Sequence, residues 1–339
     1  MTPTQPPRFA PRAFGLALLA LLALTLFGCG KDEPVKAEAA PPAVVRLGYF
    51  ANLTHAQAVL GVATGEYAKA IAPSKLETKI FNAGPSVIEA LFAGELDVAY
   101  IGPGPAISGF SKSRGQGLVV VAGAAANGVA IVAREGSGIT KLEDLAGKRV
   151  ATPQLGNTQD VAARHFLKVV LGQKNLDNVV PVANAEQAGL MSRGEIDAAW
   201  APEPWAERLI TETGAKLVGE EKDLWPSKEF ALTYVVTAPD FAKKHRPTLE
   251  ALLASHRTFT AKLSADAAGQ IPTLSEALFQ LTGKKLPEGV LPRALARVKF
   301  TDAADQATLD TYATWSFDLG FEKVKPDVTT MIDKTFGAK

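Results

Sequence analysis

The sequence predicts an α/β protein of two similar lobes, each a mostly parallel sheet flanked by helices, with a ligand cleft between the lobes. A phrase that occurs twice is the first observation: Gly94-Glu95-Leu96-Asp97-Val98-Ala99-Tyr100 is matched at 194–200 by Gly-Glu-Ile-Asp-Ala-Ala-Trp. In both copies a helical stretch ends near a glycine, a short apolar strand follows, and a Pro-rich turn starts another helix. The second observation is the alternation of strands with helices up to about residue 237, which is typical of βαβ units. Two related lobes imply a cleft between them, and a cleft implies a small-molecule ligand.

Each expected element has a local signature. The run 118–122 is apolar throughout, which suits a strand buried on both faces, and 230–237 is rich in β-branched and aromatic residues. Thr54 can cap a helix that runs toward Tyr67, and Pro85 suits the first turn of the next helix. Further strands are expected at 44–50, 76–81, 98–101, 129–134, 149–151, 179–182 and 216–218, and further helices at 142–148, at 158–171 and from 239 onward, with Thr301-Asp302 as the cap of the last long helix.

The order of these elements suggests where the chain passes between the lobes. The small, polar stretch 123–128 is the expected first crossing, and the strand 230–237 is the expected return. Residues after 239 have no repeat partner and should pack on the first lobe. We therefore expect lobe 1 to be discontinuous, with residues 43–126 and 230–339, and lobe 2 to comprise residues 127–229.

The N-terminus carries a processing signal rather than part of the fold. Arg8 and Arg12 precede an apolar run, 13–27, that is shorter than the roughly 20 residues of a membrane-spanning helix. Leu26-Phe27-Gly28-Cys29 closes the run and resembles a bacterial lipobox. This resemblance implies that residues 1–28 are a signal peptide, that Cys29 carries a lipid, and that 29–42 is a flexible tether. The alternative is an uncleaved anchor helix, and either case puts the folded part outside the cytoplasm and on a membrane.

Composition excludes several classes of protein. Cys29 is the only cysteine, so no disulfide can form within the chain and no Cys-based zinc site is available. The 36 basic and 35 acidic residues nearly cancel, and the densest basic cluster, 243–246, fits a helix C-terminus better than a nucleic-acid surface. We expect no nucleic-acid partner, and a monomer whose long chain supplies a large core.

Candidate binding residues follow from the rule that ligands of open α/β sheets bind beyond the carboxyl ends of parallel strands. Several of these loops place small or hydroxyl residues just before a helix, where the first amides lack internal partners and attract anions. The candidates are Asn52, Thr54, His55, Asn82, Gly84, Ser86, Gly102, Gly104, Gln154, Gly156, Asn157, Thr158, Asn184, Glu203 and Trp205.

Each candidate also has a purely structural interpretation. The residues before helices can be ordinary caps, and His55 can be a capping or surface residue. Trp205 can wall or cover the cleft, or it can pack between helices. Glu203 can bind a cationic group of the ligand, accept hydrogen bonds from neighbouring amides, or face a transporter.

Catalytic motifs are not found in this sequence. The four histidines show no H-E-x-x-H spacing, and there is no G-x-S-x-G elbow or G-x-x-x-x-G-K-[ST] loop. Gly102-Pro103-Gly104 is too short and too Pro-rich for a dinucleotide fingerprint. We therefore expect no enzyme activity, no cofactor and no metal.

Several segments together resemble a known family. They are the lipobox, Gly48-Tyr49-Phe50-Ala51-Asn52-Leu53-Thr54-His55, Ile101-Gly102-Pro103-Gly104-Pro105, Ala151-Thr152-Pro153-Gln154-Leu155-Gly156-Asn157-Thr158-Gln159-Asp160 and Glu203-Pro204-Trp205. This set resembles the substrate-binding proteins of ABC transporters for nitrate, taurine and aliphatic sulfonates, over roughly 44–240. The resemblance implies a type II periplasmic binding fold that captures a solute by hinge closure and delivers it to a membrane permease and its ATPase.

The resemblance leaves the ligand open. It implies a small anionic solute, similar to nitrate or a sulfonate, facing the turn Gly156-Asn157-Thr158. No arginine stands at the start of a candidate loop, and Arg134 at a strand end is better placed than Arg164 within a helix. The alternatives are a neutral or heterocyclic solute such as a thiamine-pyrimidine precursor, and a ligand-sensing module that takes no part in transport. A related pyrimidine-synthesising enzyme would need a Cys-rich loop, which this chain lacks.

Overall fold

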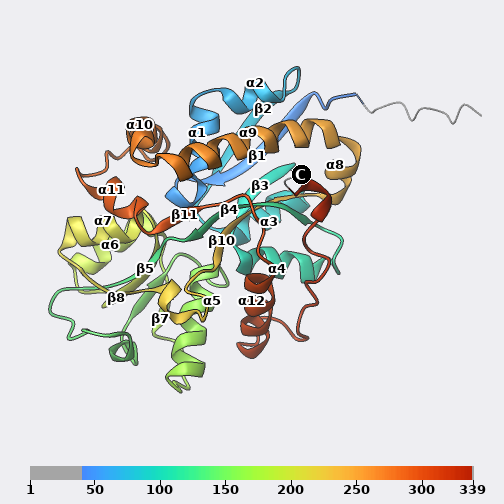
Figure 1. Cartoon of the computed structure of the whole chain (residues 1–339). Coiled ribbons are helices and arrows are strands. Elements are labelled where there is room, and N and C mark those ends of the chain that lie inside the picture. The colour runs from blue at the N-terminus through green and yellow to red at the C-terminus, as the bar shows by residue number, and fades with distance from the viewer. Residues whose placement is uncertain (1–39, 338–339) are drawn as a thin grey trace, which may run out of the picture. The chain divides into compact units, whose positions relative to one another are not determined.

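Two β-sheets, which correspond over five of their strands, form the framework of the computed structural model, which describes residues 40–337 (Figure 1). The first sheet has the order β11-β4-β10-β3-β1-β2 and the second has the order β7-β6-β8-β5-β9. The strands of the first sheet are β1 (Val44–Phe50), β2 (Lys75–Phe81), β3 (Val98–Ile101), β4 (Val119–Asn127), β10 (Ala231–Thr237) and β11 (Val298–Phe300). Those of the second are β5 (Val129–Ala133), β6 (Val150–Thr152), β7 (Val179–Pro181), β8 (Ala198–Pro202) and β9 (Lys216–Glu220).

The repeat seen in the sequence is a structural repeat. The copy at 94–100 leads into β3, and the copy at 194–200 leads into β8. Five strands of the first sheet, in the order β2-β1-β3-β10-β4, correspond to the second sheet, β7-β6-β8-β5-β9, and β3 and β8 are the third strand of each series. The fourth strand of each series is the one that the chain enters on arriving from the other sheet. It is β10 in the first sheet, which follows β9 along the chain, and β5 in the second sheet, which follows β4. The expectation of a two-sheet α/β fold is therefore confirmed.

The expectation of mostly parallel sheets is wrong. Among the named strands of residues 40–337, parallel pairing is confined to β1 with β2 and β3, and to β6 with β7 and β8. The crossing strands β10 and β5 are antiparallel to both of their neighbours, and β11 is antiparallel to β4. A strand that arrives from the other sheet enters from the opposite end, so it must run against its neighbours, and both sheets are mixed.

We call the first sheet with its helices lobe 1 and the second sheet with its helices lobe 2. The strands change sheet between Asn127 and Val129 and again between Glu220 and Ala231. The boundaries expected from the sequence, 126/127 and 229/230, stay predictions: the first lies one residue before the end of β4, and the second lies between β9 and β10. Helix α12 (Gln306–Asp318) contacts both α4 (Pro103–Lys112) of lobe 1 and α5 (Thr158–His165) of lobe 2, so the C-terminal part of the chain joins the two lobes.

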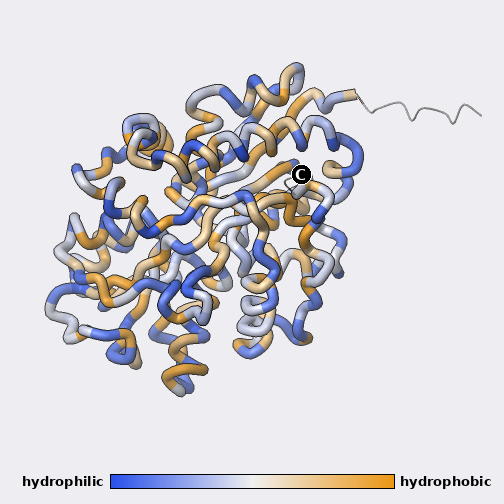
Figure 2. Tube along the Cα trace, in the orientation of Figure 1, coloured by the Kyte–Doolittle hydropathy of each residue, from blue (hydrophilic) through white to orange (hydrophobic). Residues whose placement is uncertain are grey.

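The helices follow the strands as the alternation predicted. They are α1 (Ala56–Ala63), α2 (Glu66–Ala70), α3 (Gly84–Phe92), α4 (Pro103–Lys112), α5 (Thr158–His165), α6 (Asn184–Ser192), α7 (Trp205–Thr213), α8 (Pro239–Lys244), α9 (Arg246–Ala265), α10 (Ile271–Thr282) and α11 (Val290–Leu295). Helices α1 and α9 cover one face of the first sheet, and α3 and α4 cover the other (Figure 1). Polar and apolar residues alternate along α9 with the period expected of a helix that is buried on one side (Figure 2).

Three local expectations need correction. Thr54 lies in the short helical turn Leu53–His55 and does not cap α1. The helix expected at 158–171 is α5 followed by a π-helical turn, Phe166–Val170. Helix α12 is capped by Asp305, whose carboxylate accepts the amide hydrogens of Ala307 and Thr308. Asp305 directly precedes the helix, whereas the expected cap residues Thr301 and Asp302 lie further upstream.

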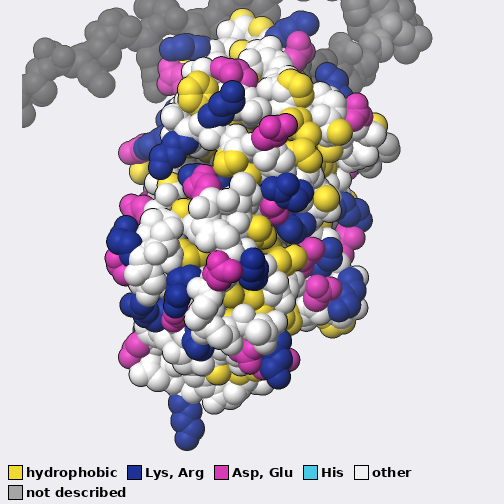
Figure 3. Space-filling view, turned by 90° about the vertical axis from the view of Figure 1, so that its left-hand side faces the viewer, with side chains coloured by type: hydrophobic (Ala, Val, Ile, Leu, Met, Phe, Trp, Pro, Cys, Tyr) yellow, Lys and Arg dark blue, Asp and Glu magenta, His cyan; other side chains and the backbone are white. Residues whose placement is uncertain are grey.

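The apolar core is continuous between the lobes on one side only. One cluster of buried residues includes Ile101 and Ile107 of lobe 1, Trp200 of lobe 2 and Tyr312 of α12, whereas two further clusters each belong to a single sheet. On the face shown in Figure 3, basic and acidic side chains are interspersed, in keeping with the near-zero net charge. No helix between residues 40 and 337 has both the length and the apolar character needed to cross a membrane.

Candidate functional site between the two sheets

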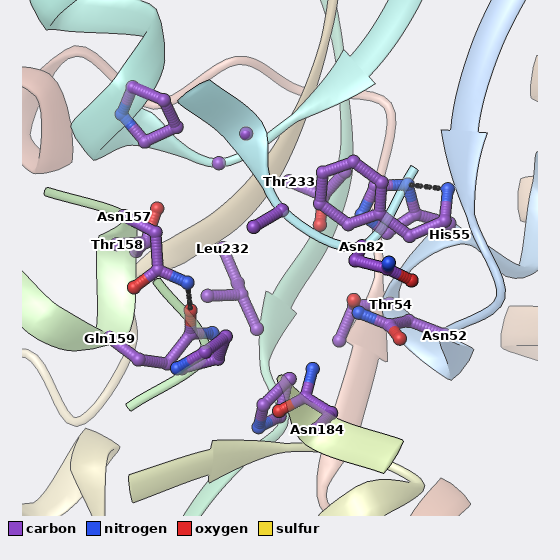
Figure 4. A pocket seen from close by; sticks show the side chains of 17 residues that line it. Asn52, Thr54, His55, Asn82, Asn157, Thr158, Gln159, Asn184, Leu232 and Thr233 are labelled. Atoms are coloured by element: carbon purple, nitrogen blue, oxygen red, sulfur yellow. Dashed lines mark hydrogen bonds between the residues drawn. The ribbon is translucent and has the colours of Figure 1, made fainter. Parts of the chain in front are cut away.

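Loops from both lobes meet around a small cavity of ≈ 30 Å³ (Figure 4). The loops that follow β1, β2 and β3 reach it from lobe 1, and those that follow β6, β7 and β8 reach it from lobe 2. Its lining is Phe50, Asn52, Thr54, His55, Asn82, Ala83, Gly84, Gly102, Pro105, Pro153, Asn157, Thr158, Gln159, Asn184, Pro202, Leu232 and Thr233. The convergence agrees with the rule that open α/β sheets bind ligands beyond the carboxyl ends of their parallel strands.

Three helices begin at the cavity wall. Gly84 is the first residue of α3, Thr158 of α5 and Asn184 of α6, and all three residues line the cavity. The first amides of each helix have no partner within the helix, and the positive end of the helix dipole lies at the same place. The backbone therefore makes this cavity electropositive without any charged side chain.

The turn before α5 is held in shape by a buried carboxylate. Asp160 accepts hydrogen bonds from the Gly156 amide and the Thr152 hydroxyl, both at 2.9 Å, and its carboxylate also bonds the guanidinium of Arg164. Gly156 has a φ of +73°, a left-handed conformation that favours glycine. Asn157 caps α5 by accepting the Asp160 amide hydrogen at 2.9 Å, which presents the N-terminal end of the helix to the cavity.

His55 faces the cavity as a neutral donor. Its Nδ1 accepts the amide hydrogen of Phe50 at 3.3 Å, and the two rings stack with centroids 4.3 Å apart (Figure 4). Because Nδ1 is an acceptor, the neutral imidazole carries its hydrogen on Nε2. Burial lowers the pKa of His55 to about 3, so the ring is uncharged at any physiological pH.

The polar lining of the cavity is amide and hydroxyl in character. Among the described residues, no Lys, Arg, Asp or Glu side chain lines it. Asn52, Asn82, Asn157 and Asn184 supply both donors and acceptors, and the Nδ2 of Asn157 donates to Gln159 at 3.2 Å. Any charge selectivity of the cavity must therefore come from the backbone amides at the helix ends.

The two lobes touch directly at the edge of the cavity. The Leu53 amide donates to the Glu203 carbonyl at 3.1 Å, and the Gly104 amide donates to Oγ1 of Thr158 at 3.3 Å. A Cβ added to Gly102 would lie 2.1 Å from the same Thr158 oxygen. Glycine at these positions thus permits close approach of the lobes, and the structure is that of a closed cleft.

The sequence-based candidates fall into two groups. Those in the cavity lining are Asn52, Thr54, His55, Asn82, Gly84, Gly102, Asn157, Thr158 and Asn184. Ser86, Gln154, Gly104, Gly156, Glu203 and Trp205 do not line it. Gly104 and Gly156 lie instead along a separate groove between the lobes, and Trp205 lines a neighbouring chamber with Asn52.

Glu203 takes part in a buried ion cluster away from the cavity. Its Oε1 accepts from Arg297 at 2.8 Å and its Oε2 accepts from the Glu207 amide at 3.1 Å. Arg297 also bonds Glu207 at 2.7 Å, which ties the C-terminal segment to α7. Burial raises the pKa of Glu203 to about 7, against the opposing effect of Arg297. The two arginines considered from the sequence are also paired elsewhere, Arg134 with Asp197 and Arg164 with Asp160.

Several lining residues were not selected from the sequence. Pro153, Gln159 and Pro202 are next to selected residues, and a wider window around each loop would have included them. Leu232 and Thr233 come from the start of β10, which the strand-end rule does not select. Because β10 is antiparallel to β3, its amino end lies beside the carboxyl ends of the parallel strands.

Comparison with known proteins agrees with this geometry. Residues 38–271 match the model of the NMT1-like family. The chain belongs to the NMT1-like family. It is 29% identical over 180 residues to the taurine-binding periplasmic protein of Escherichia coli K12, covering 52% of this chain and 53% of that protein. The chain spans about half the length of the first curated relatives it matches.

Solved structures with the same fold include two binding proteins. The alkanesulfonate-binding protein SsuA of Xanthomonas axonopodis pv. citri, bound to MOPS, aligns with a TM-score of 0.69 and 22% identity over 86% of this chain and 98% of its own. The nitrate-binding protein NrtA of Synechocystis PCC 6803 aligns with a TM-score of 0.70 and 17% identity over 84% of this chain and 83% of its own. At these identities the likeness establishes the fold, and the expected periplasmic-binding-protein fold of this NMT1-like chain is confirmed.

Proposed function

We propose that this chain is the extracytoplasmic solute-binding component of an ABC importer, which captures a small anionic solute by closing its two lobes and delivers it to a membrane permease and its ATPase. The observation that carries the proposal is the cavity between the lobes, at which the N-terminal ends of α3, α5 and α6 converge. The names of the relatives, which bind taurine, alkanesulfonate and nitrate, support the same class of solute.

The energetics of the helix ends suit an anion. A helix dipole contributes roughly 0.3–2 kcal/mol to a nearby negative charge, and each hydrogen bond to a charged group contributes about 1.5–3 kcal/mol. Three or four such contacts, less the entropy of association, reach the roughly −8 kcal/mol of micromolar binding. The neutral Nε2–H of His55 is a further donor at the wall, and no carboxylate in the lining repels an anion.

A neutral polar solute is the second candidate, because the lining within residues 40–337 has no cationic side chain to balance a full negative charge. Asn82 and Asn184 each offer an amide with donors and an acceptor, a pattern that also suits a heterocycle such as a pyrimidine. For either solute we propose binding without chemistry, since His55 uses its only acceptor nitrogen on the Phe50 amide and is not free to act as a general base.

A thermal-shift screen tests the proposal and separates its two forms. A ligand that binds only the folded state raises the melting temperature, and we expect nitrate or short sulfonates to do so in a set that also holds bicarbonate, pyrimidines and small amines. A shift with pyrimidines alone would support the second candidate, and no shift with any member at millimolar concentration would contradict both. Solution scattering should then show a smaller radius of gyration with the ligand bound, because hinge closure compacts a two-lobed protein.

We also propose that the protein is a monomer held on the membrane by a lipid on Cys29. The signal peptide, residues 1–28, Cys29 itself and most of the tether at 29–42 lie outside the described residues. The support is the order of charge, apolar run, small residue and cysteine at residues 8–29. The variant Cys29→Ala should appear in the soluble fraction. If as much of this variant as of the unchanged protein stayed with the membrane, the proposed lipid anchor would be contradicted.

A further inference from the structure

A second chamber adjoins the ligand cavity on its outer side. Its volume is ≈ 220 Å³, and it shares Asn52, Asn82 and Asn184 with the inner cavity. The inner cavity, at ≈ 30 Å³, is much smaller than this second chamber. A solute with more than a few atoms must therefore part the lobes or extend past these three asparagines into the outer chamber.

The outer chamber is walled by apolar side chains. Phe81 and Ile80 at the end of β2 form part of the wall, and Leu281 of α10 and Trp205 of α7 complete it. Trp205 is held across the cleft because its Nε1 donates to Oδ1 of Asn52 at 2.6 Å. The chamber thus has an amide-lined inner end and an aromatic outer end.

Cations already occupy the aromatic walls. The guanidinium of Arg208 lies 5.2 Å from the centroid of the Trp205 ring, and the ammonium of Lys79 lies 5.5 Å from that of Phe81. Each of these two rings therefore already has one cation within cation–π distance. No Asp or Glu side chain lines the chamber within residues 40–337.

We propose that the outer chamber is a second ligand subsite, which receives the uncharged tail of an organic oxyanion and discriminates against a tail that ends in an ammonium group. This inference rests on the proposed function, since it takes the inner cavity as the site of the oxyanion head. An ammonium moved from water into this chamber would lose hydration without gaining a carboxylate partner, which is strongly unfavourable. An alkyl tail loses nothing of this kind and gains contact with apolar walls.

Matched sulfonates test the subsite by calorimetry on the purified protein. Ethanesulfonate and 2-aminoethanesulfonate, which is taurine, have the same head and differ in the terminal ammonium. We expect ethanesulfonate to bind at least about tenfold more tightly than taurine, because the ammonium is desolvated without a partner. Taurine binding as tightly as ethanesulfonate, or more tightly, would overturn the proposal.

Methanesulfonate and nitrate, which have no tail, distinguish the failure of this inference from the failure of the proposed function. If they bind while ethanesulfonate and taurine bind equally, the oxyanion site stands and the tail subsite is overturned. If none of the four binds, the anion-binding function fails and the subsite falls with it.

A charge placed in the chamber wall gives an independent test. Ile80 is 38% exposed and lies on the edge strand β2, so a polar replacement there should leave the fold intact. Ile80→Asp should bring taurine affinity up about tenfold relative to ethanesulfonate by supplying the missing partner, whereas the uncharged Ile80→Asn should not change the ratio. Leu217→Asp, a similar change at an exposed position of β9, controls for overall charge. An unchanged ratio in folded Ile80→Asp would overturn the proposal.

Discussion

Asn127 and Phe230 hydrogen bond to each other at the place where the chain crosses between the two sheets. The Asn127 amide donates to the Phe230 carbonyl at 3.0 Å, and the Phe230 amide donates to Oδ1 of Asn127 at 3.3 Å. Asn127 ends β4, and Phe230 immediately precedes β10. The two crossings are therefore one hydrogen-bonded unit, and any change of angle between the lobes must be accommodated around this pair.

The Asn127 side chain should contribute measurably to stability. Its φ of +60° is left-handed, a conformation that asparagine tolerates better than most residues. We expect Asn127→Ala to lower the free energy of unfolding by about 1–3 kcal/mol, because it adds backbone strain and removes the acceptor for Phe230. Urea unfolding followed by circular dichroism measures the change.

Two further substitutions divide this effect into its causes. Asn127→Asp keeps an acceptor oxygen and tolerates the same backbone, so it should retain most of the stability. Asn127→Gly relieves the strain and removes only the side-chain bond. If alanine proved as stable as asparagine, the side-chain bond across the crossings would have no energetic role.

The glycines at the start of α4 should control closure of the cleft. A Cβ at Gly102 would meet Oγ1 of Thr158 at 2.1 Å, so Gly102→Ala should hold the lobes apart and weaken ligand binding by about tenfold or more. Thr158→Ala removes that oxygen, and the double variant should bind better than the two single effects predict. Calorimetry with whichever ligand the screen identifies measures all four proteins.

Gly104 provides the matched control for this coupling. A Cβ at Gly104 would lie 3.2 Å from Cα and N of Thr158, which no side-chain truncation removes. Gly104→Ala should therefore weaken binding without any rescue by Thr158→Ala. Equal rescue at both positions would mean that the Thr158 side chain is not what limits closure.

The sequence predicted most of the loops that line the cavity, and the binding of a ligand by these loops stays a prediction. Residues of strand-end loops, such as Asn52, Asn82 and Asn157, could be selected because their positions depend on local strand and helix patterns. The contribution of Leu232 and Thr233 could not, since it depends on β10 entering the first sheet antiparallel after the chain has passed through lobe 2. Long-range pairing of this kind leaves no local signal in the residues themselves.

The glycines and Glu203 show a second limit of the sequence. Gly102 and Gly104 could be interpreted as a backbone cradle for a ligand, whereas in the structure they also let Thr158 of the other lobe approach. The partner of Glu203 is Arg297, 94 residues away along the chain. A sequence motif gives the residue type and its neighbours in the chain, and it gives no information about which distant side chain will be opposite.

The His55 imidazole should stay uncharged between pH 8 and pH 5. Burial lowers its pKa to about 3 from an ordinary 6.5, so the neutral form gives stability above pH 6.5 that is lost as the pH falls toward 3. We expect the imidazole signals of His55 in NMR spectra to remain those of the Nε2–H tautomer from pH 8 to pH 5. A transition near pH 6.5, with anion affinity rising as the ring gains charge, would show instead that His55 binds ligand as a cation.

Glu221 should make stability depend on pH in the opposite sense. It is buried, and it accepts from Nε1 of Trp200 in β8 at 2.7 Å and from the hydroxyl of Tyr312 in α12 at 2.9 Å. Burial raises its pKa to about 7 from 4.5. A carboxyl whose pKa is raised on folding gives stability that is complete below pH 4.5 and is lost as the pH rises through 7, here up to about 3 kcal/mol.

Glu221→Gln does not titrate, so the stability advantage of the unchanged protein over this variant should shrink from pH 5 to pH 8. Thermal unfolding across this range measures the difference, with the exposed Glu276→Gln as the control. A difference that stayed constant with pH would show that Glu221 is ionised throughout, and that its two donors outweigh the loss of hydration.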